Sequence, residues 1–501
     1  MSRVSYVLTL PYSLDRTRVF RRLVRESYLL ERQSQGPHAQ GHDTEQHTQA
    51  STLPLPLLAK YGHWIRQLPS PDTLCTRLKN PDGLTQQQQG NGVDIEQPTN
   101  YDLMRHLYKH CPALEVHQLS QASNELISDD FLKIIAEYVI PRTRHLYLYG
   151  GSLEFWRLMY LLDHGSNILE SFTTDVITIY CVDERGQEES QKDAKPWKLK
   201  RLGVLRGMNM LNAGWCWSWL WKRCGQVEQL EVMQFRDFFQ SLVEGIRTHM
   251  PKLNKLILRE CDLDDNDVAA LLSSSHHGWK EIVLEGSPTT IKGPATEALM
   301  QQCSVLEKFV ADRCEHFSGH DTVRVLASSP NLHTSMTTRV DANVFVDRYP
   351  HTGSLRAWAC EASLTSLRVG ITGVPRPDLP ECRVQELYPG QGREIQSQAY
   401  DRLARLTKLE SLWLGQTVSS WRLACLELSL ESGLHKLSGL RSLKELGVMS
   451  LALKIGVEEV QWMAESWPEL RTIHGMDLSN ESPCKEAVEW LQRNRPEIRL
   501  R

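Results

Sequence analysis

Apolar residues recur along most of this chain in one short pattern: an apolar residue, two spacers, a second apolar residue, and a third one or two places later. The clearest copy is LNKLIL, in which Leu253, Leu256 and Leu258 have the spacing of a short strand. Val268 and the leucines that follow it have the spacing of one helical face. Residues 253–272 therefore predict a strand, a turn and a helix, which together make one structural repeat.

The pattern returns at a nearly constant interval. The first eight central positions are 26 to 30 residues apart, and the later intervals range from 27 to 45 residues. These positions are Leu146, Phe172, Leu202, Leu230, Leu256, Ile282, Phe309, Ser335, Leu367, Leu412, Leu446 and Ile473. One strand–helix unit cannot bury its apolar face alone, so we expect the units to stack into a parallel sheet with a helix behind each strand. The longer intervals indicate insertions within a continuing array.

Five predicted helices run into a proline that lies two residues before the first apolar position of the next strand. The proline ring removes a backbone donor and disfavours helix in the residue before it, so each proline marks a boundary between helix and strand. These prolines are Pro112, Pro251, Pro330, Pro468 and Pro496.

The N-terminal fifth of the chain has a different texture. Residues 31–53 and 81–99 are rich in Gln, Gly, His, Thr and Pro and poor in aliphatic residues, so they cannot bury enough apolar surface to fold. We therefore predict an N-terminal segment at 1–30 and a largely disordered linker with a short amphipathic stretch at 31–100. Residues 101–501 are predicted to form an α/β solenoid of about 12 to 13 irregular repeats, a curved horseshoe with parallel strands inside and helices outside.

The repeat sequence itself resembles a known class. Leu253, Leu256 and Leu258 are followed by Cys261 and Leu263, and Leu306 and Phe309 by Cys314. This spacing is similar to the cysteine-containing leucine-rich repeats of F-box substrate receptors and ribonuclease-inhibitor-like proteins. The resemblance implies that the two cysteines cap the turn after the strand from inside, and that Asp264, Asp265 or Asn266 caps the next helix. The structural positions of the repeat are Leu253, Leu256, Leu258, Cys261, Ile282, Leu306, Phe309, Cys314, Leu367, Leu412 and Leu446.

The resemblance also implies an F-box near the N-terminus, a module of short helices that docks on a Skp-type adaptor. Leu10 and Pro11 suit its beginning, but no acid follows them directly and the segment is basic. Residues 1–30 are therefore a candidate F-box remnant. A divergent member of the class and a gene model that begins after the box both remain open.

Charge and composition argue against nucleic-acid-binding and membrane-spanning proteins. The formal net charge is −4 over 501 residues, without a basic run, which argues against a nucleic-acid partner. Nowhere do eighteen apolar residues follow one another, so no membrane span is expected. The twelve cysteines form no CxxC pair and mostly sit within apolar patterns. These features suit a reducing compartment, and we expect the chain in the cytoplasm, the nucleus or both.

No set of catalytic or metal-binding residues emerges from the sequence. We find no nucleophile elbow, P-loop, kinase signature or HExxH motif, and we predict neither an enzyme nor a cofactor. Cys314, His316 and His320 look like zinc ligands, but no second ligand pair lies at finger spacing. Residues 262–273 resemble a calcium loop, but Asp267 and Ser273 stand where glycine and glutamate are required. No metal site is predicted.

Four tryptophans alternate in GWCWSWLWKRC, in the helical part of their repeat. Spread around a helix, these rings would either pack against neighbouring elements or anchor a partner, and core packing is the more common use of aromatic residues in such a layer. They are Trp215, Trp217, Trp219 and Trp221.

The predicted function is that of a protein-binding scaffold, with the substrate-recognition subunit of an SCF-type ubiquitin ligase as the leading role. Its partners would be a protein on the concave face and, if an F-box exists, a Skp-type adaptor and a cullin. The alternative is a leucine-rich-repeat regulator or inhibitor without a ligase connection. Geometry selects, beside the strand leucines, the candidate contact residues Lys255, Ile257, Arg259, Lys280, Val283, Glu285, Arg368, Trp413 and Lys444.

Overall fold

The computed structural model describes most of the chain after residue 99. The described ranges are 100–111, 118–120, 128–178, 195–204, 207–208, 214–234, 239–285, 291–312, 314, 317–374, 391–415, 426–448, 455–476 and 484–501. The predictions for residues 1–30 and for nearly all of 31–100 lie outside them. The chain divides into two compact units, Met1–Glu231 and Val232–Arg501. None of the described helices combines the length and apolar character that a membrane crossing requires.

The first unit contains parallel strands followed by helices. Its strands pair in the order β1 (Gln118–Ser120), β2 (His145–Glu154), β3 (Ser171–Thr178) and β4 (Arg201–Val204); β5 (Gly207–Met208) pairs with β3, and β6 (Gln229–Met233) lies at the boundary between the units. Its helices are α4 (Asn100–His110), α5 (Asp129–Ile134), which continues into η2 (Ile135–Val139) and η3 (Ile140–Arg142), α6 (Phe155–His164) and α8 (Gly214–Lys222).

The second unit repeats the same arrangement. Strands β7 (Lys255–Arg259), β8 (Glu281–Glu285), β9 (Lys308–Asp312), β10 (Thr334–Asp341), β11 (Ser366–Thr372), β12 (Ser411–Trp413), β13 (Glu445–Gly447), β14 (Thr472–His474) and β15 (Arg499–Leu500) pair in chain order, all in parallel. Its helices are α9 (Phe239–His249), α10 (Asp265–Leu272), α11 (Gly293–Met300), α12 (Gly319–Ser328), α13 (Ala342–Val346), η4 (Ala359–Ala362), α14 (Gln391–Ala404), η6 (Leu434–Gly439), α15 (Val457–Ser466) and α16 (Lys485–Asn494).

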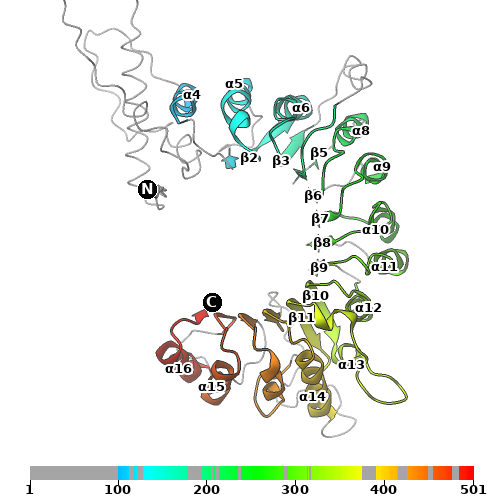
Figure 1. The fold of residues 1–501 in the computed structure, drawn as a ribbon, viewed down its shortest axis with the longest axis vertical. Helices are drawn as coiled ribbons and strands as arrows, with labels where there is room; N and C mark the ends of the chain where they lie inside the picture. Colours follow the sequence, from blue (N-terminus) through cyan, green and yellow to red (C-terminus); the bar gives the residue numbers. More distant parts are fainter. Residues whose placement is uncertain are drawn as a thin grey trace, which may run out of the picture. The chain divides into compact units, whose positions relative to one another are not determined.

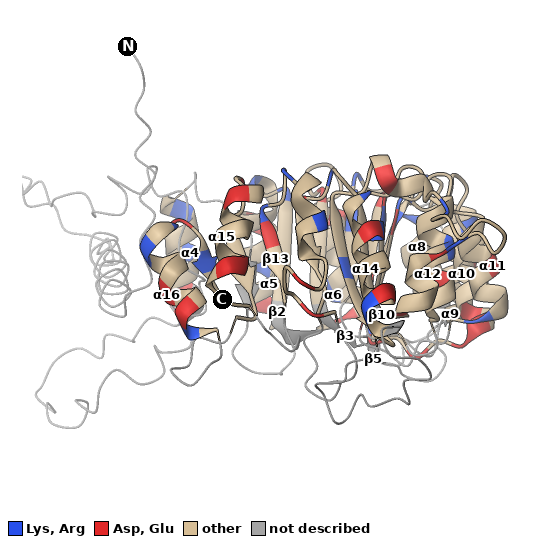
Figure 2. Ribbon diagram, turned by 90° about the horizontal axis from the view of Figure 1, so that it is seen from below, with Lys and Arg blue, Asp and Glu red and all other residues tan. Residues whose placement is uncertain are grey.

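Within the second unit the strands follow a curved path, and the helices lie outside it (Figure 1). We call the face of its sheet that turns away from the helices the inner face. Basic and acidic residues are interspersed along the helices and strands of both units (Figure 2). The predicted α/β repeat architecture, an open parallel sheet flanked by helices, is confirmed.

The predicted central positions of the repeats face one another in register. Leu256 pairs with Ile282, and Ile282 pairs with Phe309. The same row continues through Ser335, Leu367, Leu412, Leu446, Ile473 and Leu500. In the first unit, Leu146, Phe172 and Leu202 form the equivalent row. From Leu256 to Ile473 these side chains are at most 1% exposed, so each rung of the sheet contributes one residue to a continuous core.

Two cysteines occupy the turn positions that the resemblance implies. The Cys261 thiol donates to the carbonyl oxygen of Val232 at 3.6 Å, and the Cys314 thiol donates to that of Leu284 at 3.3 Å. Each acceptor belongs to the strand of the preceding repeat, so each thiol ties its turn to the preceding strand. Asp264 caps α10 by accepting from the backbone N–H of Asp267 at 2.8 Å.

The proline boundaries also agree with the sequence. The helices α4, α9, α12, α15 and α16 each end two residues before their proline. The residue before a proline is disfavoured in helical conformation, so the chain leaves the helix there and turns into the next strand.

The tryptophans of α8 belong to the core of the first unit. Trp217, Trp219 and Trp221 are at most 6% exposed. Trp217 stacks on Trp221 with ring centroids 5.5 Å apart, and Trp219 packs on Trp156 at 5.4 Å. These three rings therefore pack in the core, and they do not form an exposed surface that could anchor a partner. The side chain of Trp215 lies outside the described residues.

Candidate functional site

Side chains on the inner face of the second unit form rows, because alternate residues of a strand point to opposite faces and the strands pair in register. The central row runs across eight strands. It consists of Ile257, Val283, Val310, Met336, Arg368, Trp413, Gly447 and His474. Four of the predicted contact residues belong to this row. They are Ile257, Val283, Arg368 and Trp413.

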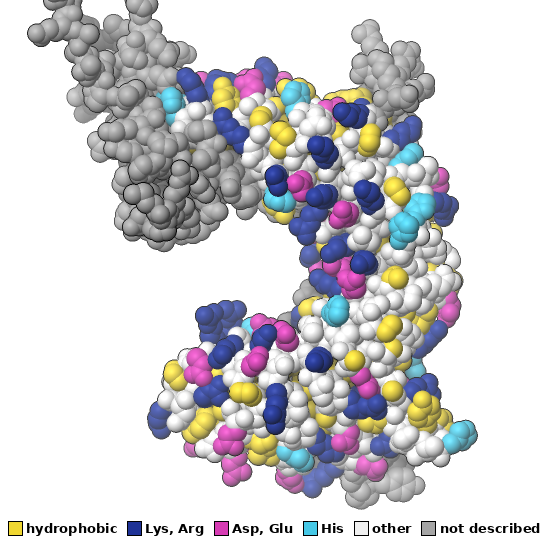
Figure 3. Space-filling view, viewed as in Figure 1, with side chains coloured by type: hydrophobic (Ala, Val, Ile, Leu, Met, Phe, Trp, Pro, Cys, Tyr) yellow, Lys and Arg dark blue, Asp and Glu magenta, His cyan; other side chains and the backbone are white. Residues whose placement is uncertain are grey.

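Strands β7–β9 carry paired charges. Lys255 forms an ion pair with Glu281, and Arg259 forms one with Glu285. Near these strands, Figure 3 shows basic and acidic side chains next to one another. Because each charge is already matched by a neighbour on the adjacent strand, a partner would gain little by pairing with it.

Lys280 lies just before β8 and binds Glu307 at 2.8 Å. The hydrogen bond and the charge of Glu307 raise the pKa of Lys280 above its ordinary value. Lys444 stands at the corresponding place before β13 and binds Glu410 at 2.8 Å, which raises the pKa of Lys444 in the same way. Both lysines are exposed, but they lie at the edge of the sheet and their charges are compensated within it.

Among the predicted contact residues, Val283 is the most buried. Its side chain is only 4% exposed, and it therefore offers almost no surface to a partner. Val283 lies between Ile257 and Val310 in the central row. The ion pairs Lys255–Glu281 and Arg259–Glu285 flank it on either side along the strands. Ile257 itself is half-buried.

Strands β11–β14 bring together a different group. The Arg368 guanidinium lies over the Trp413 ring, 5.4 Å from its centroid. On the far side the ring contacts His474, with centroids 4.5 Å apart and a tilt of 31°. An indole held between a guanidinium and an imidazole has few alternative rotamers, so the half-buried ring is presented in a defined orientation.

The polar edge of the indole is also held. Trp413 Nε1 donates to the Ser411 hydroxyl at 3.1 Å, and that hydroxyl donates to Glu445 Oε2 at 3.3 Å. Ser411 and Glu445 pair across neighbouring strands. These hydrogen bonds fix the indole nitrogen, and the ring stays half-buried, so part of its surface remains exposed.

Gly447 makes the arrangement possible. A Cβ at this position would lie 2.3 Å from ring carbons of Trp413. Neighbouring strands are about 4.8 Å apart, so a side chain on β12 must cross one whole strand to reach β14. The glycine on β13 lets the indole lie over the backbone and meet His474.

The structure therefore joins two predicted residues, Arg368 and Trp413, and adds two that the sequence analysis missed. Gly447 and His474 each follow a central repeat position, Leu446 or Ile473, by one residue, as Trp413 follows Leu412. Counting one place on from each central position would have placed all of them in the same row. The strand register could be predicted from the sequence. That the Trp413 ring would pack on the backbone of Gly447 could not.

Metal and thiol chemistry do not add to this site. Among the described residues, no group of three or more His, Cys, Asp and Glu side chains could hold a metal ion. His316 lies outside the described residues, and Cys314 bonds to a backbone carbonyl. The eight cysteines in the described part of the chain are all buried and reduced. Burial raises the pKa of Cys111, Cys216 and Cys360 to about 12, so these thiols are protonated at neutral pH.

Comparisons with known proteins give little beyond this geometry. No protein-family model matches the sequence, and no curated protein matches it. Among solved structures, the chain is similar to one described as "Crystal structure of Rad7 and Elc1 complex in yeast", at 14% sequence identity and a TM-score of 0.35. That similarity covers 79% of this chain and 83% of the other. The assignment of the repeat architecture rests on the strand register described above.

Proposed function

We propose that this protein is a scaffold that binds another protein, and that the partner docks on the inner face of β11–β14 around Trp413. The observation that carries the proposal is the Trp413 ring held between Arg368 and His474 over Gly447. Tryptophan and arginine supply a large share of the binding energy in protein interfaces. A ring that is already oriented loses little conformational entropy on binding.

The surroundings of Trp413 suit a protein partner. Ser366, Ser411 and Glu445 lie on the strand positions beside the central row, and Lys444 and Glu410 lie at the nearby edge of the sheet. Polar and charged groups around a central aromatic residue form the rim that excludes water from a protein interface. The protein acts, in this proposal, by binding and not by catalysis.

The test compares two half-buried tryptophans. Trp413→Ala removes the anchor on the inner face, and Trp490→Ala removes a half-buried ring on α16, on the helix side. Proteins that co-purify with the full chain from its native cells are quantified for both variants and the wild type. We expect one or more partners to be lost with Trp413→Ala and retained with Trp490→Ala. Identical sets of partners for all three chains would refute this site.

We further propose that the partner is a substrate for ubiquitination and that this chain is the recognition subunit of an SCF-type ligase. The turn cysteines, Cys261 and Cys314, support this role because the resemblance to the cysteine-containing repeats rests on them. The partners would then include a Skp-type adaptor and a cullin, and the protein would work in the cytoplasm or nucleus. Any F-box in residues 1–30 lies outside the described residues.

A purified complex decides between this role and that of a regulator or inhibitor without a ligase connection. The wild-type chain is isolated from its native cells with its bound partner and probed for an adaptor and a cullin. Their presence in stoichiometric amounts supports the ligase role. A complex that holds the partner but neither of these proteins supports the regulator instead.

A further inference from the structure

A short hairpin interrupts the repeat between α13 and η4. It spans Asp347–Arg356, and Arg348 pairs with Leu355 in an antiparallel bridge. The N–H of Arg356 donates to the Asp347 carbonyl at 2.9 Å, which closes the base of the hairpin. The hairpin lies on the helix side of the sheet, next to α13 (Figure 1). It contributes to the longer interval between the repeat positions of β10 and β11.

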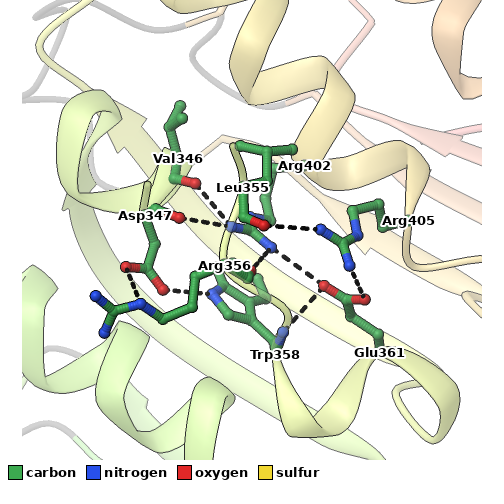
Figure 4. A network of polar contacts seen from close by, with 8 residues as sticks. All are labelled: Val346, Asp347, Leu355, Arg356, Trp358, Glu361, Arg402 and Arg405. Carbon is green, nitrogen blue, oxygen red and sulfur yellow. Dashed lines mark hydrogen bonds and ion pairs between the residues drawn. The ribbon is translucent and has the colours of Figure 1, made fainter. Parts of the chain in front are cut away.

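A buried arginine holds both legs of this hairpin. Arg402 of α14 is 0% exposed, and its guanidinium donates to the Arg356 carbonyl at 2.6 Å, the Val346 carbonyl at 2.8 Å and the Asp347 carbonyl at 3.0 Å (Figure 4). It also bonds to Glu361 at 3.1 Å. Burial lowers the pKa of Arg402 to about 10, so the side chain remains charged at neutral pH. The hairpin therefore has a fixed base.

The carboxylates near the hairpin are directed inward. Asp347 accepts from Trp358 Nε1 at 3.3 Å and lies 3.7 Å from Arg356 Nε. Glu361 binds Arg405 at 2.9 Å in addition to Arg402. The side chains of both acids are less than a fifth exposed, at 16% and 18%. Their negative charges are compensated by Arg356, Arg402 and Arg405, and little of either side chain is exposed to solvent.

The exposed side chains of the hairpin are basic or aromatic. Arg348, His351 and Arg356 are exposed, and Tyr349 is 45% exposed. The Arg356 guanidinium lies over the Tyr349 ring at 5.1 Å. Arg348 makes no ion pair with any described residue. The hairpin thus combines the exposed ring of Tyr349 with the exposed guanidinium of Arg348, while the charge of Arg356 is matched by Asp347 at the base.

We propose that the hairpin Asp347–Arg356 is a second interaction surface, which binds an acidic, extended segment of a partner protein. Arginine forms short, charge-assisted hydrogen bonds with carboxylates, and Tyr349 offers apolar area beside them. The clamp by Arg402 lowers the entropic cost of binding because the loop is already ordered. Insertions in repeat arrays form loops that commonly carry binding sites. This surface lies on the helix side and is independent of the inner face around Trp413.

The test uses a fluorescein-labelled peptide of alternating glutamate and tyrosine, with a counterpart in which glutamine replaces glutamate. Binding to the full chain is followed by fluorescence anisotropy. The variants are Arg348→Glu and Tyr349→Ala, both at exposed positions where folding is not at stake. The matched control is Arg493→Glu, which reverses an exposed charge on α16. A single-stranded oligonucleotide serves as a competing polyanion.

We expect the acidic peptide to bind the wild type and to bind Arg348→Glu roughly tenfold more weakly. Arg493→Glu and Trp413→Ala are expected to bind it as the wild type does, which separates this surface from the proposed function. The proposal is overturned by three results: no binding of the acidic peptide, an equal loss with Arg493→Glu, or an Arg348-dependent binding of the oligonucleotide that exceeds that of the peptide.

Discussion

The indole ring of Trp413 occupies the space where a side chain of Gly447 would begin. The ring carbons Cδ2 and Cε3 lie 2.3 Å from the position of a Cβ at residue 447. Two carbon atoms that are not bonded to each other do not approach so closely, so any other residue at this position forces the ring to move. The contact between Trp413 and His474 depends on this absence of a side chain.

We therefore predict that Gly447→Ala displaces the ring and weakens partner binding to the level of Trp413→Ala. Overpacking is expected to lower the free energy of unfolding by about 1 to 3 kcal/mol. The matched control is Gly439→Ala, where a Cβ would meet nothing within 4 Å. Urea denaturation and partner binding are measured for both variants. Unchanged binding in Gly447→Ala would show that the ring orientation is not required.

The row of central repeat positions predicts a difference between neighbouring residues of β7. Leu256 is fully buried, and Ile257 on the inner face is half-buried. Leu256→Ala should lower the free energy of unfolding by about 2 to 5 kcal/mol, because it leaves a cavity in the core. Ile257→Ala should cost clearly less. Equal costs in chemical denaturation would contradict the assignment of the two faces.

Arg402 is expected to determine the stability of the hairpin base. Arg402→Met removes the buried guanidinium donor from the Val346, Asp347 and Arg356 carbonyls and one of the ion pairs of Glu361, and should lower the free energy of unfolding by about 3 to 5 kcal/mol. Arg402→Lys keeps the charge, but one ammonium group cannot reach both legs of the hairpin and Glu361 together. We expect hydrogen exchange at the amides of Tyr349 and Gly353 to accelerate in both variants.

Arg405→Met is the comparison variant, because Arg405 binds the same Glu361 and donates to the Leu355 carbonyl of the hairpin at 3.3 Å, but is partly exposed. Its loss should cost under about 1 kcal/mol. The assignment of a clamp to Arg402 fails if the hairpin amides exchange at wild-type rates in Arg402→Lys and Arg402→Met.

The buried thiol of Cys360 predicts a dependence of stability on pH. Desolvation raises the pKa of this thiol from 9.0 to about 12. Between these values the folded chain keeps the proton and the unfolded chain releases it, so stability falls as the pH rises. The contribution of the thiol is complete below pH 9.

We expect the free energy of unfolding of the wild type to decline more steeply above pH 9 than that of Cys360→Ala. The difference in slope should approach about 1.4 kcal/mol per pH unit. Urea denaturation at a series of alkaline pH values measures both slopes. Parallel profiles would mean that the thiol ionises equally in the folded and unfolded chains.

The candidate site was predictable in part. Arg368 and Trp413 were selected because each stands one place after a central leucine, and the structure puts them in contact. The same rule selected Val283, which is buried and has an ion pair on either side of it along the strands. Periodicity identifies the face on which a residue lies. It does not tell how much of that face its neighbours cover, because coverage depends on long side chains from adjacent strands.

The burial of Arg402 could not be predicted from the sequence. In sequence it is one of several charged residues on a polar helix, and no local pattern distinguishes it from Arg405. Its burial is set by the hairpin at Asp347–Arg356, whose carbonyls replace water around the guanidinium. An arginine can be buried only where enough acceptors converge on it, and that convergence involves segments far apart in the chain.

The amino-acid sequence by itself determined the repeating strand and helix, the helix ends at proline, and the register of the core from Leu256 to Ile473. These are local properties, because each element must bury one face and the apolar spacing specifies which one. Only the tertiary structure decided that Trp413 rests on Gly447 and meets His474, and that Arg402 clamps the hairpin. Both depend on distances between side chains of separate repeats, which the spacing of residues along one strand does not encode.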